Sequence, residues 1–214
     1  EISVKLTQLG MDFGPEVAQE RLTRLAASTP FLVWIDMESS DYVDLTLEIF
    51  RNVMLTNTNL GLCLQSYLRR TENDLESLLP LDPSIRLVKG AYKEPKEVAY
   101  PHKREVDEHY FQLSRVLLEA RLNGGMARPV IATHDTRMIE SVNRMAAELG
   151  VGKDDYEFAM LYGIERREQH RLAKSGHVVR VLISYGSSWF PWYMRRLAER
   201  PANVWFVAKQ LFRS

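Results

Sequence analysis

Short apolar runs of strand type alternate with longer amphipathic runs along the chain, and this alternation constrains the fold more than any other feature. The strand-type runs are rich in Val, Ile, Leu and Phe without strict polar alternation, as is typical of strands buried on both faces of a parallel sheet. We predict strands over residues 2–9, 31–37, 60–67, 85–92, 129–134, 156–161 and 177–185.

The amphipathic runs between these strands predict helices. Pro15 suits a first helical position, and Gly150 and Gly176 follow two of the runs as helix-ending residues. We predict helices over residues 15–27, 41–54, 71–79, 104–122, 135–149, 166–174 and 191–199, with a further apolar stretch at 204–212. Alternation at this spacing implies right-handed crossovers between parallel strands, and therefore an α/β fold.

Seven strand–helix units can be counted, and this count leaves two architectures open. An open doubly wound sheet could use seven units, whereas a (βα)8 barrel needs one more. Because the sequence starts directly on a strand run, a barrel would have its first strand upstream of residue 1. No Pro-, Gly- or Ser-rich linker divides residues 1–214, which predicts a single domain.

Composition disfavours several classes of function. The 28 basic and 28 acidic side chains balance, so no overall field attracts nucleic acid. The single cysteine, Cys63, excludes an internal disulfide, and its apolar neighbours predict a buried structural thiol. No apolar run is long enough to span a bilayer.

Motifs for other site chemistries are missing as well. The sequence has no glycine-rich nucleotide-binding motif, no Gly-x-Ser-x-Gly and no convincing metal-ligand spacing, so a Rossmann site, a serine hydrolase and a metal site are disfavoured. His102, His109, His170 and His177 lie in charged surroundings and are predicted to be solvated.

Polar residues gather at the predicted carboxyl ends of the strands, where parallel α/β folds bind their ligands. An unpaired charge buried there would cost several kcal/mol, so these side chains need partners, a cavity or a ligand. They are Lys5, Gln8, Asp36, Glu38, Gln65, Arg86, Lys89, Tyr92, Thr133, His134, Asp135, Tyr162, Ser184 and Tyr185.

Two of these positions invite pairwise predictions. Adjacent parallel strands lie about 4.8 Å apart, which makes a Lys5–Asp36 ion pair easy to form. The segment from Arg86 to Tyr92 holds the most candidate binding groups in the sequence. Arg86 and Val88 share one face of the predicted strand, and Gly90-Ala91 would leave backbone N–H groups open to a ligand. A Schiff base on Lys89 or Lys5 is an alternative use of these strand ends.

Two further motifs each allow a structural and a functional interpretation. In Thr133-His134-Asp135, Thr or Asp could cap a helix, or His134 could contact a cofactor. Arg195 and Arg196 could pair with Glu199 on a helix surface, or grip a carboxylate with parallel hydrogen bonds.

The order and spacing of several segments resemble the proline dehydrogenase family, in particular its short monofunctional bacterial type. The resemblance runs along nearly all 214 residues. It rests on Val4-Lys5-Leu6, Ile35-Asp36-Met37-Glu38, Leu64-Gln65-Ser66-Tyr67, Arg86-Leu87-Val88-Lys89-Gly90-Ala91-Tyr92, Ala132-Thr133-His134-Asp135, Tyr156-Glu157-Phe158, Leu161-Tyr162-Gly163 and Arg195-Arg196-Leu197-Ala198-Glu199.

The resemblance implies a distorted (βα)8 barrel with FAD across the strand ends. It assigns catalytic roles to Asp36 and Arg86, with Arg86 close to the flavin N5. It implies that FAD is bound by Met37, Gln65, Arg86, Val88, Lys89, Gly90, Ala91, Thr133, His134 and Glu199. It implies that the substrate is bound by Lys5, Leu182, Tyr185, Trp192, Arg195 and Arg196.

The implied reaction is oxidation of L-proline to 1-pyrroline-5-carboxylate by hydride transfer to FAD, with electrons passed to a quinone-type acceptor. Such an acceptor would suit a cytoplasmic protein in peripheral contact with the inner face of the membrane. The sequence departs from the family at the substrate ring, where a Tyr is replaced by Leu182 and another by Trp192, and where Ala159 replaces Gln. A dehydrogenase of hydroxyproline or another pyrrolidine carboxylate, or a flavin-binding relative without turnover, is therefore an alternative.

Overall fold

The computed structural model describes residues 1–186, and its seven strands form one parallel sheet. The strands are β1 (Ile2–Lys5), β2 (Val33–Asp36), β3 (Leu60–Gln65), β4 (Ser84–Val88), β5 (Arg128–Ala132), β6 (Glu157–Leu161) and β7 (Val178–Leu182). Each strand pairs in parallel with the next one along the chain. A doubly wound sheet reverses its strand order, so this unreversed order is that of a barrel.

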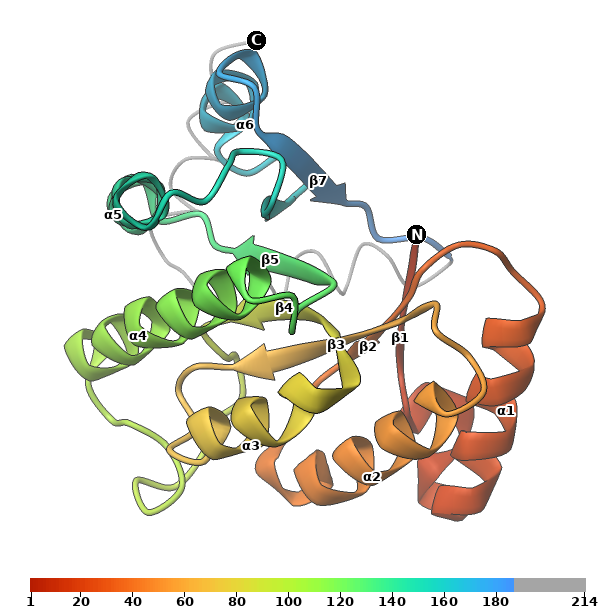
Figure 1. The fold of residues 1–214 in the computed structure, drawn as a ribbon. Helices are drawn as coiled ribbons and strands as arrows, with labels where there is room; N and C mark the ends of the chain where they lie inside the picture. Colours follow the sequence, from red (N-terminus) through yellow and green to blue (C-terminus); the bar gives the residue numbers. More distant parts are fainter. Residues whose placement is uncertain (187–214) are drawn as a thin grey trace, which may run out of the picture.

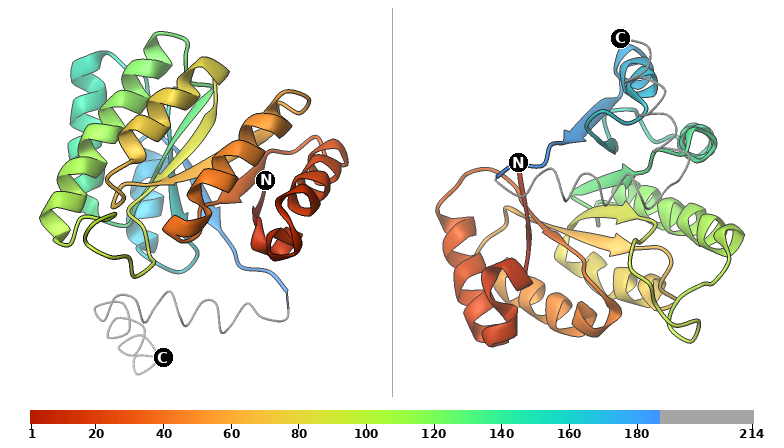
Figure 2. Two further views of the ribbon diagram at one scale, coloured as in Figure 1. Left: turned by 90° about the horizontal axis from the view of Figure 1, so that it is seen from below. Right: turned by 180° about the vertical axis from the view of Figure 1, so that it is seen from behind.

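The helices cover the outer face of the curled sheet, as Figure 1 and the two views of Figure 2 show. They are α1 (Pro15–Ala27), α2 (Val43–Met54), α3 (Thr71–Leu78), α4 (Lys103–Leu122), α5 (Thr136–Leu149) and α6 (Arg166–Lys174), with short 3-10 turns at Thr7–Leu9, Met11–Phe13, Ser40–Tyr42 and Leu79–Leu81. All six helices predicted within the described residues are confirmed. The helix predicted at 191–199 and the apolar stretch at 204–212 lie outside the described residues.

The predicted strands were correct in number and order, but most ran too far at their carboxyl ends. The first strand ends at Lys5, because the chain turns into Thr7–Leu9 and then into Gly10, whose φ of +95° no strand can use. Apolar runs continue past the sheet because residues such as Leu6 and Leu68 are buried beneath the loops. The apolar runs in the sequence therefore predicted which residues are buried, but not where each strand ends.

The sheet is curled far enough for side chains of its first and later strands to meet inside it. Glu1, next to β1, pairs with Arg128 of β5 at 2.6 Å and with Arg180 of β7 at 3.7 Å. Glu157 of β6 accepts hydrogen bonds from Arg128 at 2.6 and 2.8 Å and from Arg180 at 2.9 Å. We call Glu1, Arg128, Glu157 and Arg180 the floor cluster, because they lie at the amino-terminal half of the sheet.

Trp34 of β2 lies between the floor cluster and the other end of the sheet. Its ring is 5.8 Å from the guanidinium of Arg128 and 4.9 Å from that of Arg86, and its Nε1 donates to Glu1 at 3.0 Å. The ring fits because the next strand has Gly61, where a Cβ would lie 2.5 Å from a ring carbon. Gly61 is therefore explained by the packing of Trp34.

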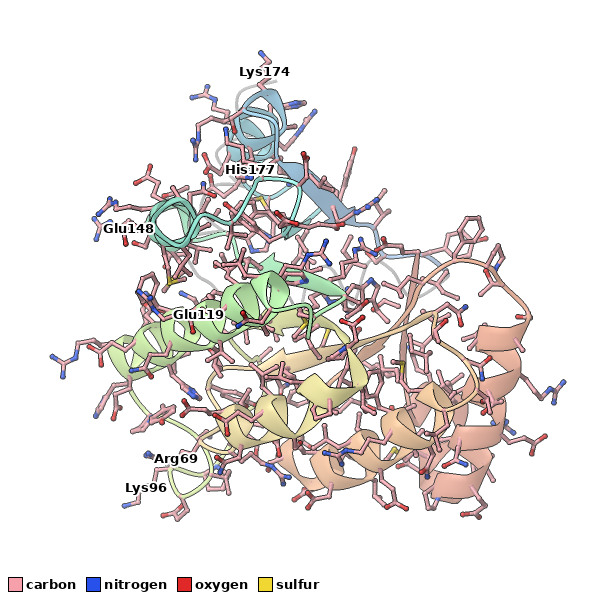
Figure 3. The ribbon with its side chains drawn as sticks, in the orientation of Figure 1. Arg69, Lys96, Glu119, Glu148, Lys174 and His177 are labelled. Carbon is pink, nitrogen blue, oxygen red and sulfur yellow. The ribbon has the colours of Figure 1, made fainter. Side chains whose placement is uncertain are left out.

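Two histidines that the sequence predicted to be solvated are buried instead. His109 is 5% exposed, and its Nδ1 lies 2.6 Å from the carbonyl oxygen of Ser66. His177, labelled in Figure 3, is 8% exposed and packs edge-on against Tyr156 and Phe158. Both predictions were wrong because charged sequence neighbours point away into solvent while the imidazole faces a neighbouring element.

None of the helices within residues 1–186 is long and apolar enough to cross a membrane.

Replacing Glu157 with Gln tests the floor cluster. Burial acts to raise the pKa of Glu157, but hydrogen bonds from Arg128 and Arg180 bring it below its ordinary value. We expect Glu157→Gln to lower the free energy of unfolding by about 2 kcal/mol at neutral pH, less than for a fully buried pair because Arg180 is half exposed. Urea denaturation measures this difference.

The same substitution has a pH signature. Because the folded pKa of Glu157 is depressed, its stabilisation is complete above the unfolded pKa and is lost as the pH falls through the folded value. The difference between the wild type and Glu157→Gln should therefore shrink in acid. Glu148→Gln, on the exposed face of α5 in Figure 3, is the control. A difference that is the same at every pH contradicts the assignment.

Candidate active site

A cavity of about 530 Å³ opens at the carboxyl ends of the strands, a size typical of small-molecule sites. The sheet brings together at its wall the predicted site residues Lys5, Asp36, Met37, Gln65, Arg86, Val88, Lys89, Gly90, Ala91, Thr133, His134 and Leu182. Three of these carry a full positive charge and one carries a carboxylate, so the lining is cationic. Several of the polar strand-end side chains therefore face a common cavity, while their roles in binding stay predictions.

The wall also includes Tyr92, one of the polar strand-end residues, and Ala159, one of the departures from the family. Other lining residues were not predicted at the site: Cys63, Ala132, Met160, Leu161 and Ile164. Cys63 precedes Gln65 by two residues on β3, and residues two apart on a strand share a face. The alternation of the strand could therefore have placed the thiol in the site. Its prediction as a buried thiol is confirmed, since Cys63 is 4% exposed.

Arg86 forms an ion pair with Asp36 across the intervening strand β3. Arg86 and Val88 line the cavity while Ile85 and Leu87 are fully buried, as the alternation of β4 predicts. Burial alone would lower the pKa of Arg86, but Cys63 and Asp36 raise it above its ordinary value. The guanidinium is therefore a permanent cation in the cavity wall.

The predicted ion pair between Lys5 and Asp36 is not formed, although the two residues are register partners in the sheet. Lys5 Nζ instead donates to the hydroxyl of Tyr92 at 2.9 Å and lies 3.9 Å from Glu38. The prediction was wrong because the carboxylate of Asp36 is occupied by Arg86 and by the hydroxyl of Ser3, at 2.8 Å.

Lys89 is held by two carboxylates behind the cavity wall. Its Nζ donates to Asp107 of α4 and, at 3.1 Å, to Asp135 at the start of α5. Burial acts to raise the pKa of each carboxyl, but hydrogen bonds from Lys89 to both and from Lys103 to Asp107 keep each below its ordinary value. Both partners of Lys89 are carboxylates on helices outside the sheet, and this geometry gives no support to the Schiff-base alternative at this lysine.

In Thr133-His134-Asp135, helix capping and a place at the cavity belong to different residues. Asp135 caps α5, since its side chain accepts a hydrogen bond from the backbone N–H of Met138 at 3.4 Å. His134 lines the cavity, and its Nε2 accepts from the backbone N–H of Leu161 at 2.9 Å. That bond places the imidazole at the junction of β5 and β6.

Gln65 has an unused acceptor in the cavity wall. Its Nε2 donates to the carbonyl oxygens of Met37 and Glu38 at 3.3 and 3.1 Å. Its Oε1 is buried and has no hydrogen-bond partner among residues 1–186. A buried acceptor without a partner costs about 1–3 kcal/mol, so a ligand with an N–H group would stabilise this site.

Gly90 is required by the close approach of Tyr67 as well as by its backbone conformation. Its φ is +110°, and a Cβ at this position would lie 2.3 Å from a carbon of the Tyr67 ring. The Tyr67 ring therefore excludes any side chain at position 90. That the backbone N–H groups of Gly90-Ala91 bind a ligand stays a prediction.

The remaining predicted site residues are not placed at the cavity. Tyr185 lies near the end of the described part, is fully exposed and is not among the residues that line the cavity, so its contact with substrate stays a prediction. Trp192, Arg195, Arg196 and Glu199 lie outside the described residues. No group of three metal-binding side chains comes together in the part of the chain that the structure describes.

A cavity at the carboxyl ends of a curled, sequentially ordered parallel sheet is where enzymes of the α/β-barrel class carry their active sites. Residues 1–209 match the family model described as proline dehydrogenase. The chain belongs to the proline dehydrogenase family, which is a family of oxidoreductases.

Relatives with names of their own agree with this assignment. The chain is 42% identical over 211 residues to proline dehydrogenase 2 of Bacillus subtilis subsp. natto, covering 97% of this chain and 68% of that protein. It is 40% identical over 220 residues to the proline dehydrogenase of Deinococcus radiodurans, covering 99% of this chain and 69% of the relative. The sequence given thus spans somewhat over two thirds of these relatives.

Among solved structures, the chain resembles proline utilization A (PutA) of Bdellovibrio bacteriovorus inactivated by N-propargylglycine, with a TM-score of 0.81 and 28% identity over 91% of this chain. It covers 24% of that much longer protein. A PutA mutant of Bradyrhizobium japonicum has a TM-score of 0.78 at 23% identity, which shows the same fold. The predicted α/β-barrel class is therefore confirmed, while an eighth strand upstream of residue 1 stays a prediction.

Gly90→Ala tests the packing of the cavity wall. Gly124→Ala is the matched control, because Gly124 also has a positive φ, +76°, but a Cβ there would meet nothing within 4 Å. Both variants bear the strain of a positive φ, about 1–3 kcal/mol, and only Gly90→Ala adds a collision with Tyr67. We expect Gly90→Ala to lose at least 1 kcal/mol more stability in urea denaturation. Equal losses would contradict the role given to Tyr67.

Proposed function

We propose that this chain is the catalytic barrel of an FAD-dependent proline dehydrogenase, which oxidises L-proline to 1-pyrroline-5-carboxylate. The observation that carries the proposal is the buried Oε1 of Gln65, which has no partner among residues 1–186 and stands in a wall otherwise rich in cations. A flavin dinucleotide combines an N–H donor on its ring with a negative diphosphate. The family membership and the relatives support the same conclusion.

The cavity wall offers groups suited to both parts of such a cofactor. Gln65 would accept from the ring, Arg86 would lie beside its N5 edge, and Lys89 would contribute a fixed positive charge. Met37, Val88, Gly90, Ala91, Thr133, His134 and Glu199 are the remaining proposed contacts. A bound flavin would supply the redox chemistry, as the acceptor of a hydride from the carbon next to the ring nitrogen of proline.

The protein's own contribution is orientation and electrostatics. Arg195 and Arg196 would hold the carboxylate of the substrate by parallel hydrogen bonds, and Lys5 would add charge beside it. Arg86, kept cationic by Asp36, would stabilise the negative charge that develops on the reduced ring. Asp36 therefore acts through Arg86 and balances its charge.

A second candidate substrate follows from the wall of the cavity. Leu182 and Ala159 both line it, at positions where the family resemblance leads us to expect a Tyr and a Gln. Both changes remove polar atoms that would face a substrate ring. Hydroxyproline or another pyrrolidine carboxylate is the alternative substrate, and Trp192 and Tyr185 are proposed to complete the ring pocket.

The electron acceptor and the location of the protein are proposed from the family alone. A quinone-type acceptor would suit a cytoplasmic protein that touches the inner face of the membrane.

An anaerobic flavin-bleaching assay tests the proposed function. The chain is reconstituted with FAD, freed of excess cofactor and mixed without oxygen with proline, hydroxyproline or glycine. We expect retained flavin absorbance and its loss on addition of proline, because reduction removes the visible band. Stronger bleaching by hydroxyproline would favour the second candidate. A yellow protein that no ring acid bleaches would be a relative without turnover, and a chain that never retains flavin contradicts the proposal.

Arg195→Met and Arg196→Met test the carboxylate clamp. Each charge-assisted hydrogen bond to a carboxylate contributes about 1.5–3 kcal/mol, so we expect KM for proline to rise about ten- to a hundredfold in each variant. Arg144→Met is the control, because Arg144 is exposed on α5. Steady-state kinetics with the flavin-loaded protein measure the change. An unchanged KM in both variants would show that the clamp is assigned wrongly.

A further inference from the structure

The guanidinium of Arg86 is held on two edges and one face by the three strands that precede β4. Nε donates to Sγ of Cys63 at 2.8 Å, and Nη2 donates to Oγ of Ser3 at 2.9 Å and to the carboxylate of Asp36. The face of the group lies 4.9 Å from the ring of Trp34. Nη1 is the one nitrogen of this group without a hydrogen bond to any of residues 1–186.

Ser3 and Cys63 both link the cation to the anion. The hydroxyl of Ser3 accepts from Arg86 and donates to Asp36 Oδ1 at 2.8 Å. The thiol of Cys63 accepts from Arg86 and donates to the same oxygen at 3.6 Å. Each neutral group uses an acceptor on one side and a donor on the other, so each fixes the rotation of the guanidinium about its ion pair.

Cys63 is suited to this structural task and unsuited to covalent chemistry. Burial raises the pKa of its thiol to about 12, so the group stays protonated and keeps its donor. A thiolate, the reactive form, is thereby suppressed. An apolar side chain of similar size would fill the same space but would leave Nε of Arg86 without an acceptor, at a cost typical of a buried unpaired donor.

We propose that Cys63 and Ser3 are positioning residues for the proposed reaction, holding Arg86 so that its free edge faces the bound flavin. The inference rests on the proposed function, because it requires a flavin in the cavity. It goes further by assigning roles to two residues outside the motifs that carry the family resemblance, the thiol of Cys63 on β3 and the hydroxyl of Ser3 on β1. Cys63 and Ser3 would affect catalysis by fixing the orientation of the Arg86 guanidinium.

Sulfite binding to the oxidised, flavin-loaded protein tests this inference without turnover. Sulfite adds to flavin N5 and leaves an anionic ring, which a nearby oriented cation stabilises. We expect Cys63→Ala to weaken the apparent sulfite affinity about tenfold, because a charge-assisted hydrogen bond to Arg86 is lost. Cys63→Ser restores an acceptor and a donor, and should stay within about twofold of the wild type.

Turnover gives a second, independent readout. Because Arg86 would act on the flavin rather than on substrate binding, Cys63→Ala should lower kcat about tenfold while KM for proline changes less than about twofold. Ser3→Ala, on the more exposed side of the same guanidinium, should change sulfite affinity and kcat in the same direction. It keeps the inference testable if Cys63→Ala does not fold. Ser114→Ala is the control, since it removes a buried hydroxyl on α4 that donates to the carbonyl oxygen of Tyr110, away from Arg86.

The results of these experiments distinguish a failure of the positioning role from a failure of the proposed function. If the wild type binds flavin and is bleached by proline, but Cys63→Ala and Ser3→Ala change only thermal stability, the two residues merely pack and the inference is overturned. If Cys63→Ser is as impaired as Cys63→Ala, the hydrogen bond is not the cause and the inference is again overturned. A wild type that retains no flavin contradicts the proposed function itself.

Discussion

The ion pair between Arg86 and Asp36 organises the catalytic end of this molecule. A guanidinium inside a curled sheet costs several kcal/mol unless every side of it finds a partner. Here the partners come from consecutive strands: Ser3 on β1, Asp36 on β2 and Cys63 on β3. The first four strands of the sheet are thus joined by side chains as well as by their backbone ladder at the end where chemistry is proposed.

The two ends of the sheet use charge differently. In the floor cluster, two acids and two arginines neutralise one another directly and close the amino-terminal end. At the carboxyl end, the carboxylates of Asp107 and Asp135 attract Lys89 from behind the cavity wall. Among the side chains that line the cavity, three cations, Lys5, Arg86 and Lys89, accompany the single carboxylate of Asp36.

Sequence periodicity predicted the strands and helices because each element has its own local pattern of burial. The same period of two would also have placed Cys63 beside Gln65 in the site. Such reasoning could not show that Lys5 and Asp36 do not pair. Strand register identifies neighbouring residues, but it does not say which long side chain from another strand forms the ion pair with Asp36. Arg86 reaches Asp36 across β3, and no local signal records that reach.

His109 and His177 show the same limit for burial, since their charged sequence neighbours say nothing of the elements that cover the imidazole rings. The sequence by itself determined the class of fold, the order of the elements, the family and most of the residues around the cavity, because these depend on local hydrophobic periodicity and on motif spacing. Only the tertiary structure decided which charged side chains form ion pairs, why Gly61 and Gly90 must lack side chains, and that the side-chain oxygen of Gln65 is left without a hydrogen bond within residues 1–186. Those outcomes depend on distances between strands that are far apart in the chain, and a linear pattern carries no such distances.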